Sequence, residues 1–264
     1  MQLPLGIYMD FGFIIAGFIV GFLVGLTGVG GGSLMTPILL FFFHVKPALA
    51  VGTDLLYASI TKSVGIFAHG KLGNIDWSIV KLLAAGSVPA SIATIFFLRT
   101  IDVDSHEAVD TIKFGLGIAL IITSAAVLFR AKIMSLLAKE TLIPEKYVAS
   151  STVILGIILG GLVTLTSVGA GALGVTALVV LYPHKKITTI VGSDIAHAVP
   201  LTLVAGLGHA SLGTVDYSLL GVLLIGSIPG IYIGSHLSSK VSEHWIRIAL
   251  AAILIYVGLK LVLH

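Results

Sequence analysis

The residues of this sequence best suited to chemistry are ionisable side chains placed deep inside long apolar stretches. Lys62 lies within the apolar segment 47–68, and His197 lies within the segment 187–208. An ammonium group at membrane depth attracts an anion, and a histidine there can hydrogen-bond an oxyanion or take up a proton near neutral pH. We predict that Lys62, His197 and Tyr57, which aligns with His197 in an internal repeat, contribute to an anion-binding site. The alternatives are that the Lys62 side chain extends to the membrane surface and that His197 is a packing residue.

Two aspartates occupy matching contexts, Asp54 at the end of the string VGTD and Asp194 at the end of VGSD. Three roles are open to them: carrying a proton, binding a cation, or capping backbone donors near a helix break. Helical spacing places Asp54 and Lys62 on one face but about 12 Å apart along the helix axis. A direct ion pair between these two side chains is therefore not expected.

Two glycine-rich runs interrupt the apolar sequence at equivalent places, TGVGGGS from Thr27 and TSVGAG from Thr166. Glycine runs sustain a helix poorly, so each run predicts an unwound turn followed by the start of a new helix. Backbone N–H groups and the positive helix end then point at one spot, which suits an anion. The alternative is close helix packing through small residues. The predicted ligand residues in these runs are Thr27, Gly28, Gly30, Gly31, Gly32, Ser33, Thr166, Ser167, Gly169 and Gly171.

Composition indicates that membrane helices position these residues. The chain has 264 residues, of which 57% are hydrophobic and 10% charged, with a mean hydropathy of +1.12. A soluble domain is about 25% charged, so a soluble fold is excluded. One bilayer crossing needs roughly 20 apolar residues, which leaves room for about eight to ten helices and short loops. The sequence contains no cysteine, and we expect no cofactor, no bound metal and no catalytic residue.

The chain consists of two copies of one unit. A shift of 140 residues aligns Asp54 with Asp194 and His69 with His209, and a shift of 139 aligns the glycine-rich runs. The copies span 1–130 and 147–264, with a polar linker at 131–146. Each copy contains five apolar segments. They lie at 11–29, 34–43, 47–68, 77–98 and 108–129 in the first copy, and at 148–168, 172–182, 187–208, 217–238 and 245–263 in the second.

The second segment of each copy, 34–43 or 172–182, is too short to cross a bilayer and follows a glycine-rich run. Short segments of this kind at equivalent places in two halves are typical of a transporter binding site. Each copy then makes an odd number of crossings, which predicts two repeats of inverted topology. Loops near 72, 138, 184 and 240 carry most of the Lys and Arg residues, so the linker is predicted in the cytoplasm and both termini outside. Histidines at loop edges are predicted at the membrane interface: His44, His69, His184 and His209.

Several strings resemble a known family. They are GFIVGFLVGLTGVGGGSLMTPILL from Gly17, AVGTDLLYA from Ala50, GKLGNIDW from Gly70, VGSDIAHAVP from Val191 and HASLGTVDY from His209. Together with the duplicated layout they resemble the sulfite exporter TauE/SafE family, within the toluene-sulfonate uptake permease superfamily, over almost the whole chain. The resemblance implies an inner-membrane carrier of small organic or inorganic anions, often sulfur-containing, whose site is formed by the glycine-rich runs. The roles given to Lys62 and His197 rest on the residues alone.

The sequence therefore predicts an all-α integral membrane protein with short or broken helices after the glycine-rich runs. It would move a small anion, such as sulfite, a sulfonate or a small carboxylate, across the inner membrane by alternating access. Proton coupling through His197 or an aspartate is left open. The expected partners are the anion and the lipid bilayer, without nucleic acid, and a homo-oligomer is left open.

Two other classes of protein use buried acids. A divalent-cation transporter would bind its ion through Asp54 and Asp194, although Lys62 nearby opposes a cation. An intramembrane aspartyl protease would use the same two acids as a dyad. The strings VGTD and VGSD differ from the GxGD of that protease class, and duplication accounts for both acids without catalysis.

Overall fold

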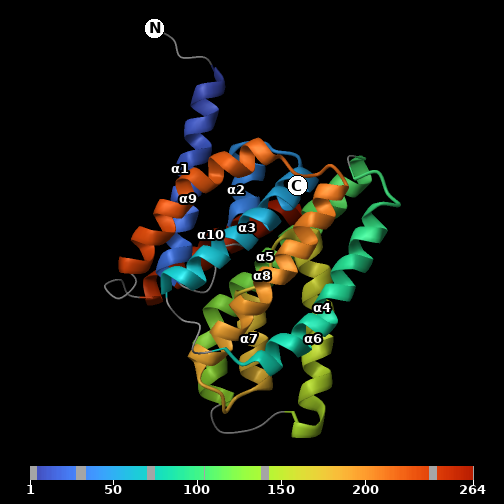
Figure 1. The fold of residues 1–264 in the computed structure, drawn as a ribbon, viewed down its shortest axis with the longest axis vertical. Coiled ribbons are helices and arrows are strands. Elements are labelled where there is room, and N and C mark those ends of the chain that lie inside the picture. The colour runs from blue at the N-terminus through green and yellow to red at the C-terminus, as the bar shows by residue number, and fades with distance from the viewer. Residues whose placement is uncertain are drawn as a thin grey trace.

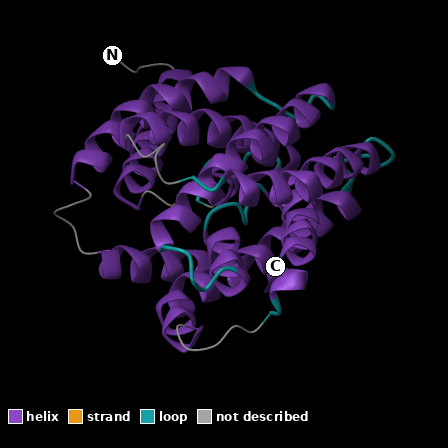
Figure 2. Ribbon diagram, turned by 60° about the horizontal axis from the view of Figure 1, so that its bottom comes forward, coloured by secondary structure: helices purple, strands orange, loops and turns teal. Residues whose placement is uncertain are grey.

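A computed structural model describes residues 5–27, 34–69, 75–103, 105–137, 143–237 and 243–263 of the chain. These residues form helices joined by short loops, with no strand among them, as Figure 2 shows. The helices are α1 Leu5–Thr27, α2 Met35–Phe42, α3 Pro47–His69, α4 Trp77–Leu98, α5 His106–Leu137, α6 Glu145–Thr166, α7 Ala172–Leu181, α8 Ile187–Ser211, α9 Tyr217–Leu237 and α10 Glu243–Leu263. Each corresponds to one predicted apolar segment, so the all-helical prediction is confirmed.

Helix lengths and outward-facing side chains fit a bilayer. Five helical stretches in the described part of the chain are long and apolar enough to span it: α4, residues 106–129 of α5, α6, α8 and α9. Large apolar side chains such as Phe96 and Phe97 on α4 or Ile157 and Ile158 on α6 are exposed on the protein surface. Lipid tails are the medium in which such a surface is stable. The chain is therefore a multi-pass membrane protein.

One helix runs further than the sequence pattern predicts. α5 continues to Leu137, so the first residues of the predicted 131–146 linker are helical. The stretch after Arg130 reads AKIMSLL, which is rich in good helix formers and contains neither glycine nor proline. The residues that follow the apolar segment therefore contain no helix-breaking residue, and α5 continues through them.

Helices of one copy pack on helices of the other. α1 lies beside α9 at one edge of the molecule, and α6 lies beside α4 at the opposite edge (Figure 1). On α1, a Cβ at Gly17 or Gly21 would meet the backbone of Leu223 or Ser227 of α9. Because glycine has no side chain, the two helix backbones come into direct contact, as they do at small residues in membrane helix pairs.

The α6–α4 pair repeats this contact residue by residue. A Cβ at Gly156 or Gly160 of α6 would meet the backbone of Leu83 or Ser87 of α4. These four residues are the repeat equivalents of Gly17, Gly21, Leu223 and Ser227. The first helix of each copy, α1 or α6, thus packs on the fourth helix of the other copy, α9 or α4.

Equivalent helices of the two copies also pack on each other, and they run antiparallel. Gly52 of α3 lies against His209 and Thr214 near the end of α8, whereas Leu56, one turn later on α3, lies against Gly206. In the α5–α10 pair, Ser124 Oγ donates to the Ala251 carbonyl while the earlier Gly117 meets Gly258. Antiparallel packing of equivalent helices is the arrangement expected of two repeats of inverted topology.

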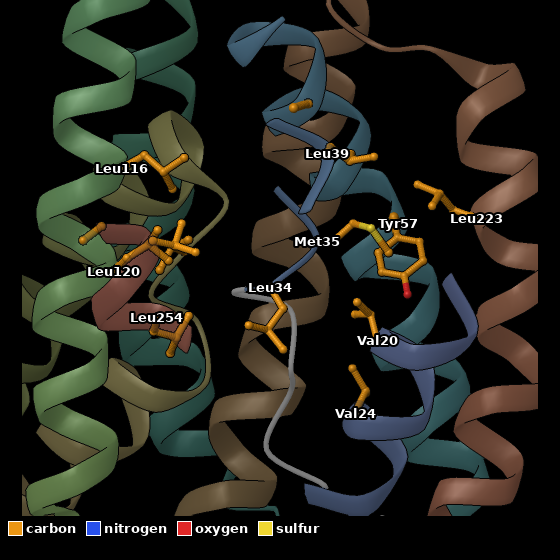
Figure 3. Packing of buried hydrophobic residues seen from close by; sticks show 14 of the residues in the cluster. Val20, Val24, Leu34, Met35, Leu39, Tyr57, Leu116, Leu120, Leu223 and Leu254 are labelled. Carbon is orange, nitrogen blue, oxygen red and sulfur yellow. The ribbon is translucent and has the colours of Figure 1, made fainter. Parts of the chain in front are cut away.

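The largest apolar core joins both copies around α2 and α3. Figure 3 shows the Tyr57 ring of α3 close to Met35 of α2 and Val20 of α1, with Leu223 of α9 nearby. Tyr57, Met35 and Val20 have no exposed surface. The short helix α2 therefore begins inside the protein and reaches the surface at its last residue, Phe42.

Candidate functional site between the two copies

Asp54 caps the short helix α2. Thr36, in the first turn of α2, donates its backbone N–H to Asp54 Oδ2 at 3.1 Å and its hydroxyl to the same oxygen at 2.6 Å. Leu34, the residue before α2, makes no side-chain cap bond. Of the three roles left open for the aspartates, the capping role is therefore present at Asp54. The start of α2 was predicted to offer backbone donors to a substrate, but the Thr36 donor is used by the protein's own carboxylate.

Asp194 lies at the equivalent place in the second copy. Its Oδ1 packs directly on Gly174 in the first turn of α7, where any Cβ would collide with it. Sequence reasoning did not identify Gly174. Its repeat equivalent, Met35, gives no sign that a side chain is excluded here.

The second glycine-rich run is unwound, as predicted. α6 ends at Thr166, and Ser167, Gly169 and Gly171 have positive φ angles of 59°, 121° and 123° before α7 begins. Thr166 Oγ1 accepts from the Val168 N–H at 3.1 Å and donates to the Leu162 carbonyl at 2.7 Å. The Thr166 hydroxyl is therefore engaged in shaping the turn.

The first glycine-rich run is only partly seen. Thr27 is the last residue of α1. The other predicted ligand residues of this run, Gly28, Gly30, Gly31, Gly32 and Ser33, lie outside the described residues, as does the Thr27 side chain.

Lys62 points into the broken segment of the other copy. Its side chain is 6% exposed, and Nζ donates to the Ala170 carbonyl at 3.2 Å. Extension to the membrane surface, the alternative for this residue, is not the conformation observed. The Lys62 charge interacts with both Asp54 and Asp194 and acts on His197. Lys62 thus links the predicted site residues of α3 and α8.

His197 and Tyr57 have equivalent surroundings. His197 Nε2 lies 2.7 Å from Ser87 Oγ of α4, and the Tyr57 side chain faces Ser227 of α9, the repeat equivalent of Ser87. In the described part of the chain, His197 Nδ1 and Tyr57 Oη are buried and make no hydrogen bond. The serines were missed as partners, although the matched strings GSVP and GSIP contain both of them.

Reciprocal hydrogen bonds give a physical reason for the similarity of the repeat strings VGTD and VGSD. Thr53 Oγ1 accepts from the backbone N–H of Asp216 at 3.0 Å, and Ser193 Oγ accepts from that of Asp76 at 2.8 Å. Thr53 and Ser193 are repeat equivalents, as are Asp76 and Asp216. In each string, the Thr or Ser hydroxyl therefore accepts a hydrogen bond from the opposite copy. The Asp carboxyl group contacts the short helix of its own copy.

We expect Thr53→Val to destabilise the protein more than Thr61→Val, because Thr53 is the acceptor that joins the copies. The change leaves the Asp216 N–H without that acceptor, which costs about 1–2 kcal/mol in free energy of unfolding. Thr61 is equally buried, but its hydroxyl donates to Tyr57 O within the same helix. Unfolding of both variants by sodium dodecyl sulfate in mixed micelles would measure the difference. Equal destabilisation would contradict a special role for Thr53.

Loop-edge groups on the two copies differ from each other. Asp76 accepts from Lys185 Nζ at 2.6 Å, and this cation holds the pKa of the Asp76 carboxyl below its usual value. His209, predicted at the membrane interface, is instead 3% exposed. Its Nδ1 lies 2.8 Å from Thr214 Oγ1 and its Nε2 2.9 Å from the Thr164 carbonyl. That prediction was wrong because contact between α8 and α6 encloses a position that follows a long apolar segment.

The apolar helices, the interrupted α6–α7 pair and the buried polar groups between two repeated halves define a multi-pass α-helical membrane transporter. The profile of the family "Sulfite exporter TauE/SafE" matches residues 13–261. The chain belongs to this family.

Similar proteins cover nearly the whole chain. "Probable membrane transporter protein YjnA" of Bacillus subtilis is 40% identical over 96% of this chain and 100% of its own length. "Probable membrane transporter protein MJ0441" of Methanocaldococcus jannaschii is 32% identical over 95% of this chain and 94% of its own length. No solved structure gives a significant match.

Proposed function

We propose that the chain moves a small oxyanion, such as sulfite, a sulfonate or a small carboxylate, across the inner membrane by alternating access. The observation that carries this proposal is the Lys62 ammonium, buried on α3 and bound to the broken segment of the other copy. An intramembrane charge of this kind is expensive unless it serves a ligand or a partner. The family name, which refers to sulfite, supports the same class of substrate.

Buried polar atoms without a hydrogen bond can complete the coordination of an oxyanion. Tyr57 Oη, His197 Nδ1 and Ser167 Oγ are buried, and within the described residues they make no hydrogen bond. A buried polar atom without a partner is unfavourable by about 1–3 kcal/mol, so these atoms gain from a bound ligand. The glycine-rich runs 27–33 and 166–171 are the proposed walls of the site.

The proposed moving units are the two copies, 1–130 and 147–264, with the 131–146 linker in the cytoplasm and both termini outside. Lys62 belongs to one copy and the Ala170 carbonyl to the other, so movement of one copy against the other changes the site. The antiparallel α3–α8 contact supports an inverted pair of repeats, the arrangement that many secondary transporters use.

The alternatives that use Asp54 and Asp194 have less support. A divalent cation needs several oxygen or nitrogen ligands at one point, whereas Lys62 acts on both carboxylates. A protease dyad needs two carboxyl groups that share a proton. Asp54 instead binds Thr36 of α2, and Asp194 packs on Gly174 of α7.

Flux into proteoliposomes tests the proposal. Purified protein would be reconstituted and supplied with labelled sulfite, methanesulfonate, acetate or Mn²⁺. We expect saturable flux of at least one of the anions and none of Mn²⁺. Folded protein that moves no anion, or that moves Mn²⁺ instead, would overturn the proposed function.

A further inference from the structure

The start of α2 is occupied by a carboxylate that belongs to the protein. Asp54 Oδ2 accepts both Thr36 donors, and the side chain has no exposed surface. Asp54 Oδ1 makes no hydrogen bond within the described residues, and the Ser167 side chain of the other copy faces this carboxyl group. A substrate anion that approaches the broken segment therefore meets a carboxyl group that repels it when ionised.

The charged groups around Asp54 do not compensate the charge of a further anion. Its neighbours on α3 are Tyr57 and Lys62, and α8 contributes Asp194 and His197 around the same Lys62. The neighbours from α2 and from the α6–α7 turn, Thr36 and Ser167, are uncharged. One lysine charge thus acts on two carboxyl groups. An added oxyanion would leave uncompensated negative charge among buried side chains, which is strongly unfavourable.

A hydroxyl group makes Asp54 suited to gaining and losing a proton. A hydroxyl can donate to a carboxylate or accept from a carboxylic acid, so the Thr36 hydroxyl at Oδ2 can satisfy both states of Asp54. In the second copy the repeat equivalent of Thr36 is Val175, which has no hydroxyl. The two aspartates therefore differ in the chemistry around them, although duplication produced both.

We propose that Asp54 is the proton-binding group of the carrier and that one proton on Asp54 accompanies each monovalent anion. This inference rests on the proposed anion transport. The proton converts the Asp54 carboxylate to a carboxylic acid, removes one negative charge and frees the Lys62 charge for the substrate. Release of both on the other side restores the carboxylate. Anion and proton then move in the same direction without net charge.

Methanesulfonate is the probe for the test, because it keeps a single negative charge over the whole pH range used. Flux into proteoliposomes would be followed together with luminal pH from a trapped dye. In the wild type we expect flux to rise as pH falls and to carry one proton per anion. Asp54→Asn keeps an acceptor for the Thr36 N–H but cannot titrate. This variant should exchange methanesulfonate at a rate independent of pH, with no proton movement.

Two further variants separate the proposal from a folding defect and from the other aspartate. Thr36→Val places at position 36 the residue that the second copy has at 175, and removes one donor to the ionised carboxylate. It should move the pH midpoint of flux upward by about one unit. Asp194→Asn should retain proton coupling at whatever rate it transports.

The outcomes distinguish the two proposals. If no wild-type anion flux occurs, the proposed function fails. If flux occurs but its pH dependence and proton movement survive Asp54→Asn, or disappear in Asp194→Asn, then the assignment to Asp54 is wrong while anion transport stands. An unshifted midpoint in Thr36→Val would also overturn the assignment.

Discussion

Methionine in place of Lys62 should reduce saturable anion flux by about tenfold to a hundredfold. The ammonium lies between the copies and acts on both Asp54 and Asp194, and a charged hydrogen bond contributes about 1.5–3 kcal/mol. Methionine has a similar length and retains the apolar contacts of the side chain. The loss should appear mainly as weaker apparent affinity, because the anion loses its counter-charge.

Lys81→Met is the matched control for this experiment. Lys81 lies on α4 with its side chain exposed, so the same substitution there removes a charge of the same type away from the site. We expect its flux to equal that of the wild type. Size-exclusion profiles of both variants would show whether they fold. Normal flux in folded Lys62→Met would remove the electrostatic basis of the proposed site.

The sequence was informative about helices because most apolar segments are long, and polar loops or glycine-rich runs separate them from one another. The short segments 34–43 and 172–182 correspond to α2 and α7, and the break after Thr166 lies at the predicted glycine-rich run. Hydropathy and glycine content are local properties, so they can be read without knowing which helices touch.

The partners of the site residues could not be read in this way. Thr36 and Ser87 look like ordinary small polar residues of membrane helices, and their roles depend on α2 facing α3 and on α4 facing α8. The burial of His209 depends likewise on the packing of α8 against α6, where its Nε2 lies beside the Thr164 carbonyl. The repeat did contain one usable signal, since Thr53 and Asp76 align with Ser193 and Asp216 and bond across the copies.

A single methyl group at Gly226 should prevent stable assembly of the two copies. A Cβ there would overlap the Ile14 carbonyl of α1, an atom of backbone that cannot rotate away. α9 and α1 would have to separate along their whole contact. We expect Gly226→Ala to lower the free energy of unfolding by about 3 kcal/mol or more, measured by unfolding with sodium dodecyl sulfate in mixed micelles.

The same helix supplies the control, and the repeat supplies a second test. Gly221 of α9 has open space at its Cβ position, so Gly221→Ala should be neutral or stabilise the helix by up to about 1 kcal/mol. Gly86 of α4 is the repeat equivalent of Gly226, and its Cβ would meet the Val153 carbonyl of α6. Gly86→Ala should therefore cost about as much as Gly226→Ala. A large loss at one glycine and none at the other would mean that only one of the two equivalent helix pairs holds the copies together, and movement between the copies would then have to occur at the weaker pair.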